Sequence, residues 1–256
     1  MNEPDEFYIG WQARAPEIHG RATRRVVVFF FAFALLAALG LSVSQRLIGN
    51  AVFEWGNVKE FTGVLHVDPY PHLVLDQTTT TNEARAVTSP LVAPFKFGVK
   101  RVDVLPFDGR AVSLRATRIF RDDQLMLELE PQSVKLAAAA VAPVGLVATI
   151  SLGRQTYRGE IVDSKCWLGV MNPGVLAPHR ACAVRCISGG VPPMLLVRRD
   201  GAPPLNLLLA SVDGKPVNEQ VIEFVAEPIE ITGEVIRQDG LLILRADPAT
   251  YRRVVR

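Results

Sequence analysis

The chain has 256 residues, of which 49% are hydrophobic and 21% are charged, a composition typical of a globular protein with one or two domains. Its net charge of +2 and the absence of a long lysine or arginine run predict no clustered basic face, so we expect no nucleic-acid partner. The 18 prolines and 19 glycines are spread along the chain, as expected where turns join many short strands.

An apolar run near the N-terminus predicts a single transmembrane helix. Val26 to Val43 contains no charged residue, and a helix of that length rises about 27 Å, close to a hydrocarbon thickness of about 30 Å. Three positive charges precede the run, at Arg21, Arg24 and Arg25. We therefore expect residues 1–25 to be a cytoplasmic peptide, residues 26–45 to cross the lipid bilayer of a bacterial inner membrane, and the rest to be periplasmic. The alternative is a secretory signal cleaved near Ser42–Ser44.

After residue 45 the hydrophobic pattern changes from helical to alternating, which predicts a body made mainly of β-strands. Aliphatic and β-branched residues alternate with polar ones in short segments bounded by Pro, Gly or Asp. The predicted strands are Phe61–Val67, Val99–Leu105, Ala111–Phe120 and Gln124–Glu130, then Tyr157–Asp163, Met194–Arg198, Leu205–Leu209, Ile229–Arg237 and Leu241–Ala246.

Two segments of the body resemble each other and predict an internal duplication. Ala111–Pro131 and Pro228–Pro248 each contain a long alternating strand, a polar turn, a second strand and then proline, the pattern of a β-hairpin. Because a similar hairpin ends each half of the β body, we favour tandem copies of one small β-barrel. We expect the first β domain at 46–133, a linker at 134–153 and the second β domain at 154–256.

All three cysteines and one histidine fall in a single segment of the second half. In chain order these candidate residues are Cys166, His179, Cys182 and Cys186. Pro178 suits the first turn of a helix, and Gly189-Gly190 suits its end. On that helix the last three candidates stand at i, i+3 and i+7 and share one face. Cys166 ends the preceding strand, so we expect it to lie against that face.

Three interpretations of this Cys/His cluster remain open. The four residues can form a Cys₃His metal site, with zinc as the expected ion. In an oxidising compartment, Cys166 can instead form a disulfide to the helix, leaving one thiol whose pKa His179 lowers. The cysteines can also be small buried apolar residues. A Cys–His pair acting as a thiol nucleophile, with Asp163 orienting the histidine, is a minority hypothesis, because no complete catalytic signature is present, and we expect no catalytic residue.

The cluster resembles a motif of uncharacterised bacterial proteins, secreted or membrane-anchored, with an OB-like fold. Their pattern is G-E-V-V-D-x-x-C, then H-x-x-C-A-x-x-C-x-x-G-G-x-P, and later P-A-N and a V-T-G-x-V strand. The matching segments are Gly159–Cys166, His179–Pro192, Pro216–Asn218 and Ile231–Val235. Within the motif Asp163, Gly189, Gly190 and Pro192 support the cluster. The resemblance covers residues 157–247; it implies an OB-like second barrel and no particular reaction.

Together these features predict a mainly β protein, with one N-terminal transmembrane helix followed by two OB-like barrels. The leading functional hypothesis is a non-catalytic, membrane-anchored periplasmic module that assists or assembles a complex, with a protein partner in the inner membrane or periplasm. The first alternative is a metal-binding or thiol-redox protein that uses the Cys/His cluster. The second is a glycan-binding barrel, since OB folds often bind oligosaccharides.

Overall fold

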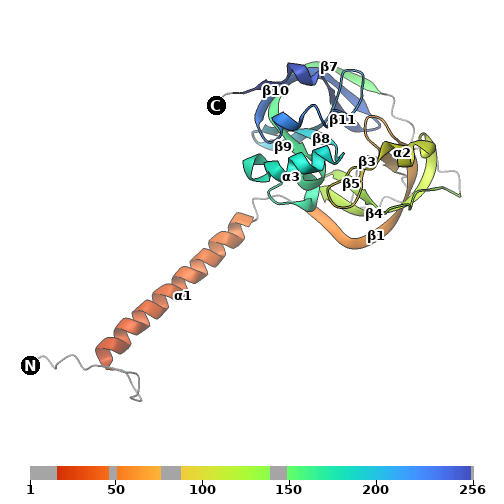
Figure 1. Ribbon diagram of the computed structural model, residues 1–256. Coiled ribbons are helices and arrows are strands. Elements are labelled where there is room, and N and C mark those ends of the chain that lie inside the picture. Colours follow the sequence, from red (N-terminus) through yellow and green to blue (C-terminus); the bar gives the residue numbers. More distant parts are fainter. Residues whose placement is uncertain (1–15, 46–50, 76–87, 139–148, 255–256) are drawn as a thin grey trace, which may run out of the picture. The chain divides into compact units, whose positions relative to one another are not determined.

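The computed structural model describes residues 16–45, 51–75, 88–138 and 149–254. The chain divides into two compact units, Met1–Gly49 and Asn50–Arg256 (Figure 1). The first unit contains the helix α1 (Glu17–Gln45), whose apolar side chains from Val26 to Val43 are exposed within the chain. By length and composition Glu17–Ser44 can span a membrane, and an N-terminal signal sequence meets the same description. The predicted apolar helix is therefore present, and it begins earlier than predicted, so that Arg21, Arg24 and Arg25 belong to it.

The first half of the body is a closed five-stranded barrel. Its strands are β1 (Ala51–His66), β2 (His72–Leu75), β3 (Thr88–Val92), β4 (Arg110–Arg121) and β5 (Gln124–Leu129). The order around the barrel is β1-β2-β3-β5-β4, and pairing of β4 with β1 closes it. The β3–β5 pair is parallel, whereas the other four pairs are antiparallel.

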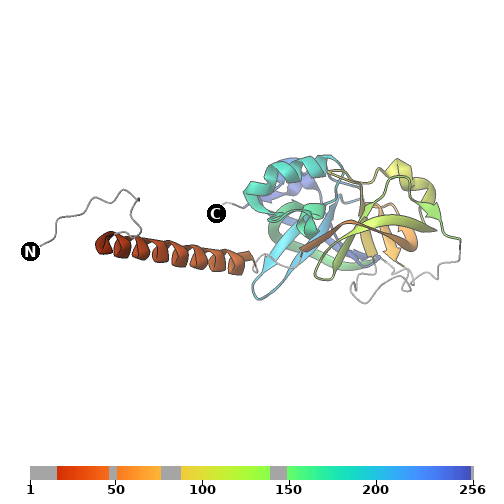
Figure 2. The same cartoon turned by 90° about the horizontal axis from the view of Figure 1, so that it is seen from below.

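The second half repeats this topology. Its strands are β7 (Ile150–Asp163), β8 (Pro193–Arg199), β9 (Ala202–Ala210), β10 (Pro228–Gln238) and β11 (Leu241–Arg245). The order is β7-β8-β9-β11-β10, with β10 pairing back to β7 and with β9 parallel to β11. The two hairpins predicted from the internal repeat are β4–β5 and β10–β11. The prediction of two OB-like barrels is confirmed, and Figures 1 and 2 show them side by side.

Buried apolar residues alternate with outward-facing residues along the strands, so each barrel has its own hydrophobic core. In β4, Val112, Leu114 and Ala116 are fully buried in the first core. In β10, Ile229 and Ile231 occupy the second core. Burial of this apolar surface, at about 25 cal/mol per Å², is the main force that holds each barrel together.

Helices fill different connections in the two barrels. In the first, α2 (Arg101–Val104) and a 3₁₀ turn, η2 (Leu105–Phe107), join β3 to β4. The strand predicted at Val99–Leu105 is therefore wrong: the segment turns as a helix with only Val104 buried, and Pro106 lies in the turn that follows. In the second barrel, the π-helix η3 (Cys166–Val170) and α3 (Leu176–Ser188) join β7 to β8.

Short elements complete the body. These are the strands β6 (Lys135–Leu136) and β12 (Arg252–Arg253) and the 3₁₀ turns η4 (Ile222–Phe224) and η5 (Pro248–Thr250). Within the expected linker, β6 and the first residues of β7 are described, and residues 139–148 lie outside the described part of the chain.

The two barrels pack through a shared apolar cluster. Its buried members are Val92, Ile119 and Met126 of the first barrel and Cys166, Leu168, Cys186 and Val191 of the second. Polar contacts cross the same interface: the Tyr70 hydroxyl donates to the Leu209 carbonyl at 2.9 Å, and the Arg121 guanidinium donates to the Trp167 carbonyl at 2.7 Å. The cysteine segment therefore lies at the junction of the two barrels.

Candidate functional site

The predicted cysteine helix is present as α3, and the end of β7 faces it. His179 and Cys186 are buried on α3, while Cys182 is half-buried. Asp163 is the last residue of β7, and its Oδ1 accepts a 2.8 Å hydrogen bond from the Cys166 amide. This bond fixes the turn into η3, so Cys166 lies in a π-helix and not at the strand end that we predicted.

The three cysteine sulfurs meet at this point. Cys166 Sγ lies 4.0 Å from Cys182 Sγ, and the Cys186 sulfur accepts hydrogen bonds from both thiols. All three are free thiols. A disulfide bond requires an S–S distance of about 2.05 Å, so the predicted disulfide is not formed in this structure. In a tetrahedral zinc site with Zn–S bonds of about 2.3 Å, two sulfurs stand about 3.8 Å apart, close to the Cys166–Cys182 separation.

His179 adds a nitrogen ligand to the sulfur cluster. Ligand atoms of Cys166, His179 and Cys182 all lie within 4.8 Å of one another, as do those of Asp163, Cys166 and Cys186. His179 Nε2 is 2.9 Å from Asp163 Oδ2, and both side chains are almost fully buried. One carboxylate thus orients the imidazole and holds the Cys166 turn, the arrangement that supports metal ligands in many proteins.

Hydrogen bonding divides the thiols into a donor and an acceptor. The hydrogen bond from Cys166 lowers the pKa of Cys186, because it stabilises the thiolate. The same bond raises the pKa of Cys166, and burial and the Asp163 charge raise it further. Loss of a proton is therefore easier at Cys186 than at Cys166, and a thiolate is the form of cysteine that binds metal.

A loop of the first barrel, residues 93–98, covers the exposed side of the cluster. Lys96 Nζ lies 2.7 Å from Cys182 Sγ, and this contact raises the pKa of Lys96. The backbone of the loop touches the end of α3, where the Gly98 amide donates to the Gly189 carbonyl at 3.0 Å. A Cβ on Gly98 would lie 1.9 Å from the Gly190 carbonyl oxygen, so only glycine permits this approach.

A buried ion pair holds the loop in place. Lys165 is 1% exposed and pairs with Glu128 of β5. Its ammonium also donates to the carbonyls of Ala93 and Phe95, at 2.9 and 2.7 Å. Our sequence interpretation missed both lysines, because Lys96 is 86 residues from Cys182 and nothing in the local pattern around Lys165 indicates a partner in the other barrel.

The supporting residues of the motif stabilise the end of α3. Gly189 is the C-cap of the helix, and Gly190 follows with a φ of 97°. The Pro192 carbonyl accepts hydrogen bonds from both the amide and the hydroxyl of Ser164, which ties the strand end to the chain beyond the helix. Asn218, from the P-x-N segment, donates to two carbonyls at the same place, at 2.8 and 2.9 Å.

Two histidines outside the cluster have partners of their own. His66 lies 3.9 Å from Asp108, whereas His72 Nε2 lies 3.2 Å from Asp239 of the second barrel. Among the described residues, groups of three or more metal-ligand side chains occur only in the Cys/His cluster. Comparisons with protein-family models, with curated protein sequences and with solved structures find no match for this chain.

Proposed function

We propose that the second barrel carries a zinc site with Cys166, His179, Cys182 and Cys186 as ligands. The observation that carries the proposal is that the ligand atoms of Cys166, His179 and Cys182 lie within 4.8 Å of one another, while Cys186 forms a second group of this kind with Cys166 and Asp163. All three cysteines are free thiols, and the sulfurs of Cys166 and Cys182 are 4.0 Å apart. Four protein ligands would close a tetrahedral zinc site and leave no open position for substrate. A closed site of this type is structural, and it supports a non-catalytic role.

The charges around the cluster support a metal-thiolate centre. Three thiolates and one neutral imidazole around Zn²⁺ have a net charge of −1. Lys96, hydrogen-bonded to Cys182, supplies a positive charge at the outer side of the cluster. Asp163 would orient the His179 ring, as carboxylates do behind zinc-bound histidines.

The wider proposal is a periplasmic accessory or assembly module anchored in the inner membrane. Its support is the single apolar helix α1, with arginines in its first turns, followed by two barrels. Fusion of alkaline phosphatase to the C-terminus tests the orientation: the proposal expects an active enzyme, and an inactive one would place the body in the cytoplasm. Affinity capture from solubilised membranes tests the partner, and recovery of this chain alone would count against an assembly role.

The glycan-binding alternative has less support. OB folds bind oligomers across their second and third strands. In the second barrel those strands are β8 and β9, and their residues Met194, Asn206 and Leu208 face a cavity against the first barrel. The first barrel therefore lies opposite these residues, where an extended glycan would have to bind.

Cobalt titration of the full chain tests the metal site. Reduced protein is titrated with Co²⁺, which gives a thiolate charge-transfer absorption when cysteines bind it. We expect one Co²⁺ per chain, displaced by Zn²⁺, with the absorption weakened in Cys182→Ser and in His179→Ala. His66→Ala, on β1, is the matched control and should titrate like the native chain. No thiolate absorption in reduced native protein would overturn the proposal and favour the disulfide or inert interpretation.

A further inference from the structure

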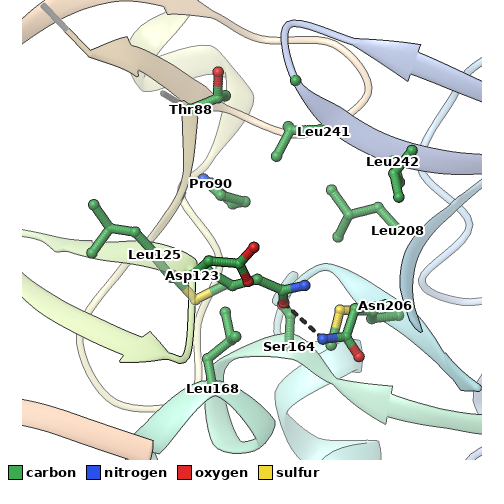
Figure 3. A pocket seen from close by; sticks show the side chains of 14 residues that line it. Thr88, Pro90, Asp123, Leu125, Ser164, Leu168, Asn206, Leu208, Leu241 and Leu242 are labelled. Atoms are coloured by element: carbon green, nitrogen blue, oxygen red, sulfur yellow. Dashed lines mark hydrogen bonds between the residues drawn. The ribbon is translucent and has the colours of Figure 1, made fainter. Parts of the chain in front are cut away.

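A cavity of about 350 Å³ lies between the two barrels, separate from the sulfur cluster (Figure 3). Equivalent parts of the barrels form its walls: residues of the parallel pair β3–β5 line one side, and residues of the parallel pair β9–β11 line the other. Ligand pockets in proteins typically measure about 300–1,000 Å³. The cavity is thus large enough for a small organic molecule.

Most of the lining is apolar. Leu125, Met126 and Leu168 line it together with Met194 and Leu208. Methionine side chains are flexible and polarisable, so two of them adapt to ligands of different shape. An apolar cavity of about 150 Å³ binds benzene, so this cavity would hold a molecule of roughly 10–15 non-hydrogen atoms.

The polar lining groups are mostly bonded within the protein. The Thr88 hydroxyl donates to the Asp239 carbonyl, and the Ser164 hydroxyl donates to the Pro192 carbonyl. Of the lining residues that the structure describes, Asp123 alone is ionisable, and it is exposed. The cavity therefore reaches the surface beside a carboxylate.

The walls are held in place before any ligand arrives. Asn206 of β9 donates to the Gln124 side chain of β5 at 2.8 Å, across the cavity lining. The turns that close the two hairpins lie at its edges and contribute Asp123 and Gly240. A preformed site of this size between two barrels favours a compact molecule over an extended polymer.

We propose that this inter-barrel cavity binds a small amphipathic molecule, with its apolar body between the barrels and a hydrogen-bond-donating amine or hydroxyl head at Asp123. The binding requires neither the zinc ion nor a catalytic step. A carboxylate head is disfavoured, because it would lie against the Asp123 charge.

Methyl NMR on the full chain in lipid nanodiscs tests the proposal. The chain contains four methionines, of which Met126 and Met194 line the cavity and Met171 is exposed elsewhere. With labelled methionine methyl groups, octylamine, octanol and octanoate are the probes. We expect saturable shifts at Met126 and Met194 and none at Met171, with octylamine binding about fivefold tighter than octanoate.

Two variants make the test specific. Leu241→Trp fills the cavity and should weaken octanol binding by about tenfold or more. Leu136→Trp, on β6 outside the cavity, is the matched control and should bind normally. Asp123→Asn should remove the preference for octylamine over octanoate. The proposal would be overturned by equal shifts at Met126, Met171 and Met194, or by shifts that do not saturate. It would also be overturned if Leu241→Trp binds octanol as the native chain does while its Met171 signal shows a native fold.

Discussion

Replacement of Lys165 by methionine should destabilise the body strongly. The substitution keeps an unbranched side chain, shorter by the terminal nitrogen, and removes the charge. Glu128 then remains nearly buried without its partner, and the carbonyls of Ala93 and Phe95 lose their donor. Because these groups lie in the other barrel, the loop over the cysteines loses its attachment at the same time.

The structure sets the magnitude of this effect. Removal of one partner from a buried ion pair typically costs about 3–5 kcal/mol, because the remaining charge is neither solvated nor paired. Domains have total stabilities of about 5–15 kcal/mol, so this single change removes a large part of the stability. For a body of about 200 residues, each kcal/mol lowers the Tm by about 2–4 °C, which predicts a decrease of roughly 6–20 °C.

Thermal unfolding of the full chain, followed by tryptophan fluorescence, measures this decrease, because Trp167, one of the three tryptophans, packs beside the interface. The double variant Lys165→Met/Glu128→Leu should recover most of the lost stability, since an apolar pair replaces the buried charges. A single-variant cost below about 1 kcal/mol, or a double variant no more stable than the single one, would show that the Lys165–Glu128 pair does not stabilise the body.

Three further predictions concern the barrel interface. Gly98→Ala places a methyl group against the Gly190 carbonyl and should push the loop 93–98 away from the cluster. Alkylation of the folded, reduced chain should then modify Cys182 faster, and an unchanged rate would show that the loop does not cover Cys182. The hydrogen bond to His72 lowers the pKa of Asp239, so the Asp239 carboxylate stabilises the fold above about pH 4, and this contribution is lost as the pH falls through the folded-state pKa. Asp239→Asn should therefore lower the free energy of unfolding by about 1–3 kcal/mol at pH 7 and by much less at pH 3. An equal loss at both pH values would contradict a stabilising His72–Asp239 pair. Tyr70→Phe removes a buried hydroxyl that is hydrogen-bonded to β9 and should lower the free energy of unfolding in urea by about 1–2 kcal/mol. An unchanged free energy of unfolding would contradict this.

The helix with the cysteine face could be predicted because its information is local. A proline near the start, two glycines at the end and the i, i+3, i+7 spacing all lie within one short segment. The duplication was visible for the same reason, since each hairpin is a contiguous alternating pattern with a polar turn. Tertiary contacts were not needed for either prediction.

Other elements are not determined by their local pattern. The strands β2 and β3 are only four and five residues long, and Pro90 lies within β3, where proline normally argues against a strand. The Val99–Leu105 segment alternates like a strand, yet it forms a helix in the connection between β3 and β4. In both cases the closure of the barrel decides the structure.

The candidate site was predicted only in part. Spacing placed His179, Cys182 and Cys186 together, and the resemblance to a motif added Asp163 and the glycines. Lys96 and the Lys165–Glu128 pair could not be found in this way, because they come together only when the two barrels pack. The inter-barrel cavity has the same origin, since strands from both halves form its walls.

The central claim is that the three cysteines and His179 hold one zinc ion. Intact mass of the full chain, native and denatured, with and without thiol alkylation, tests it most directly. We expect a native mass excess of one zinc ion and three alkylatable thiols after denaturation and chelation. One alkylatable thiol and no bound metal would contradict it, because two of the cysteines would then be joined in a disulfide.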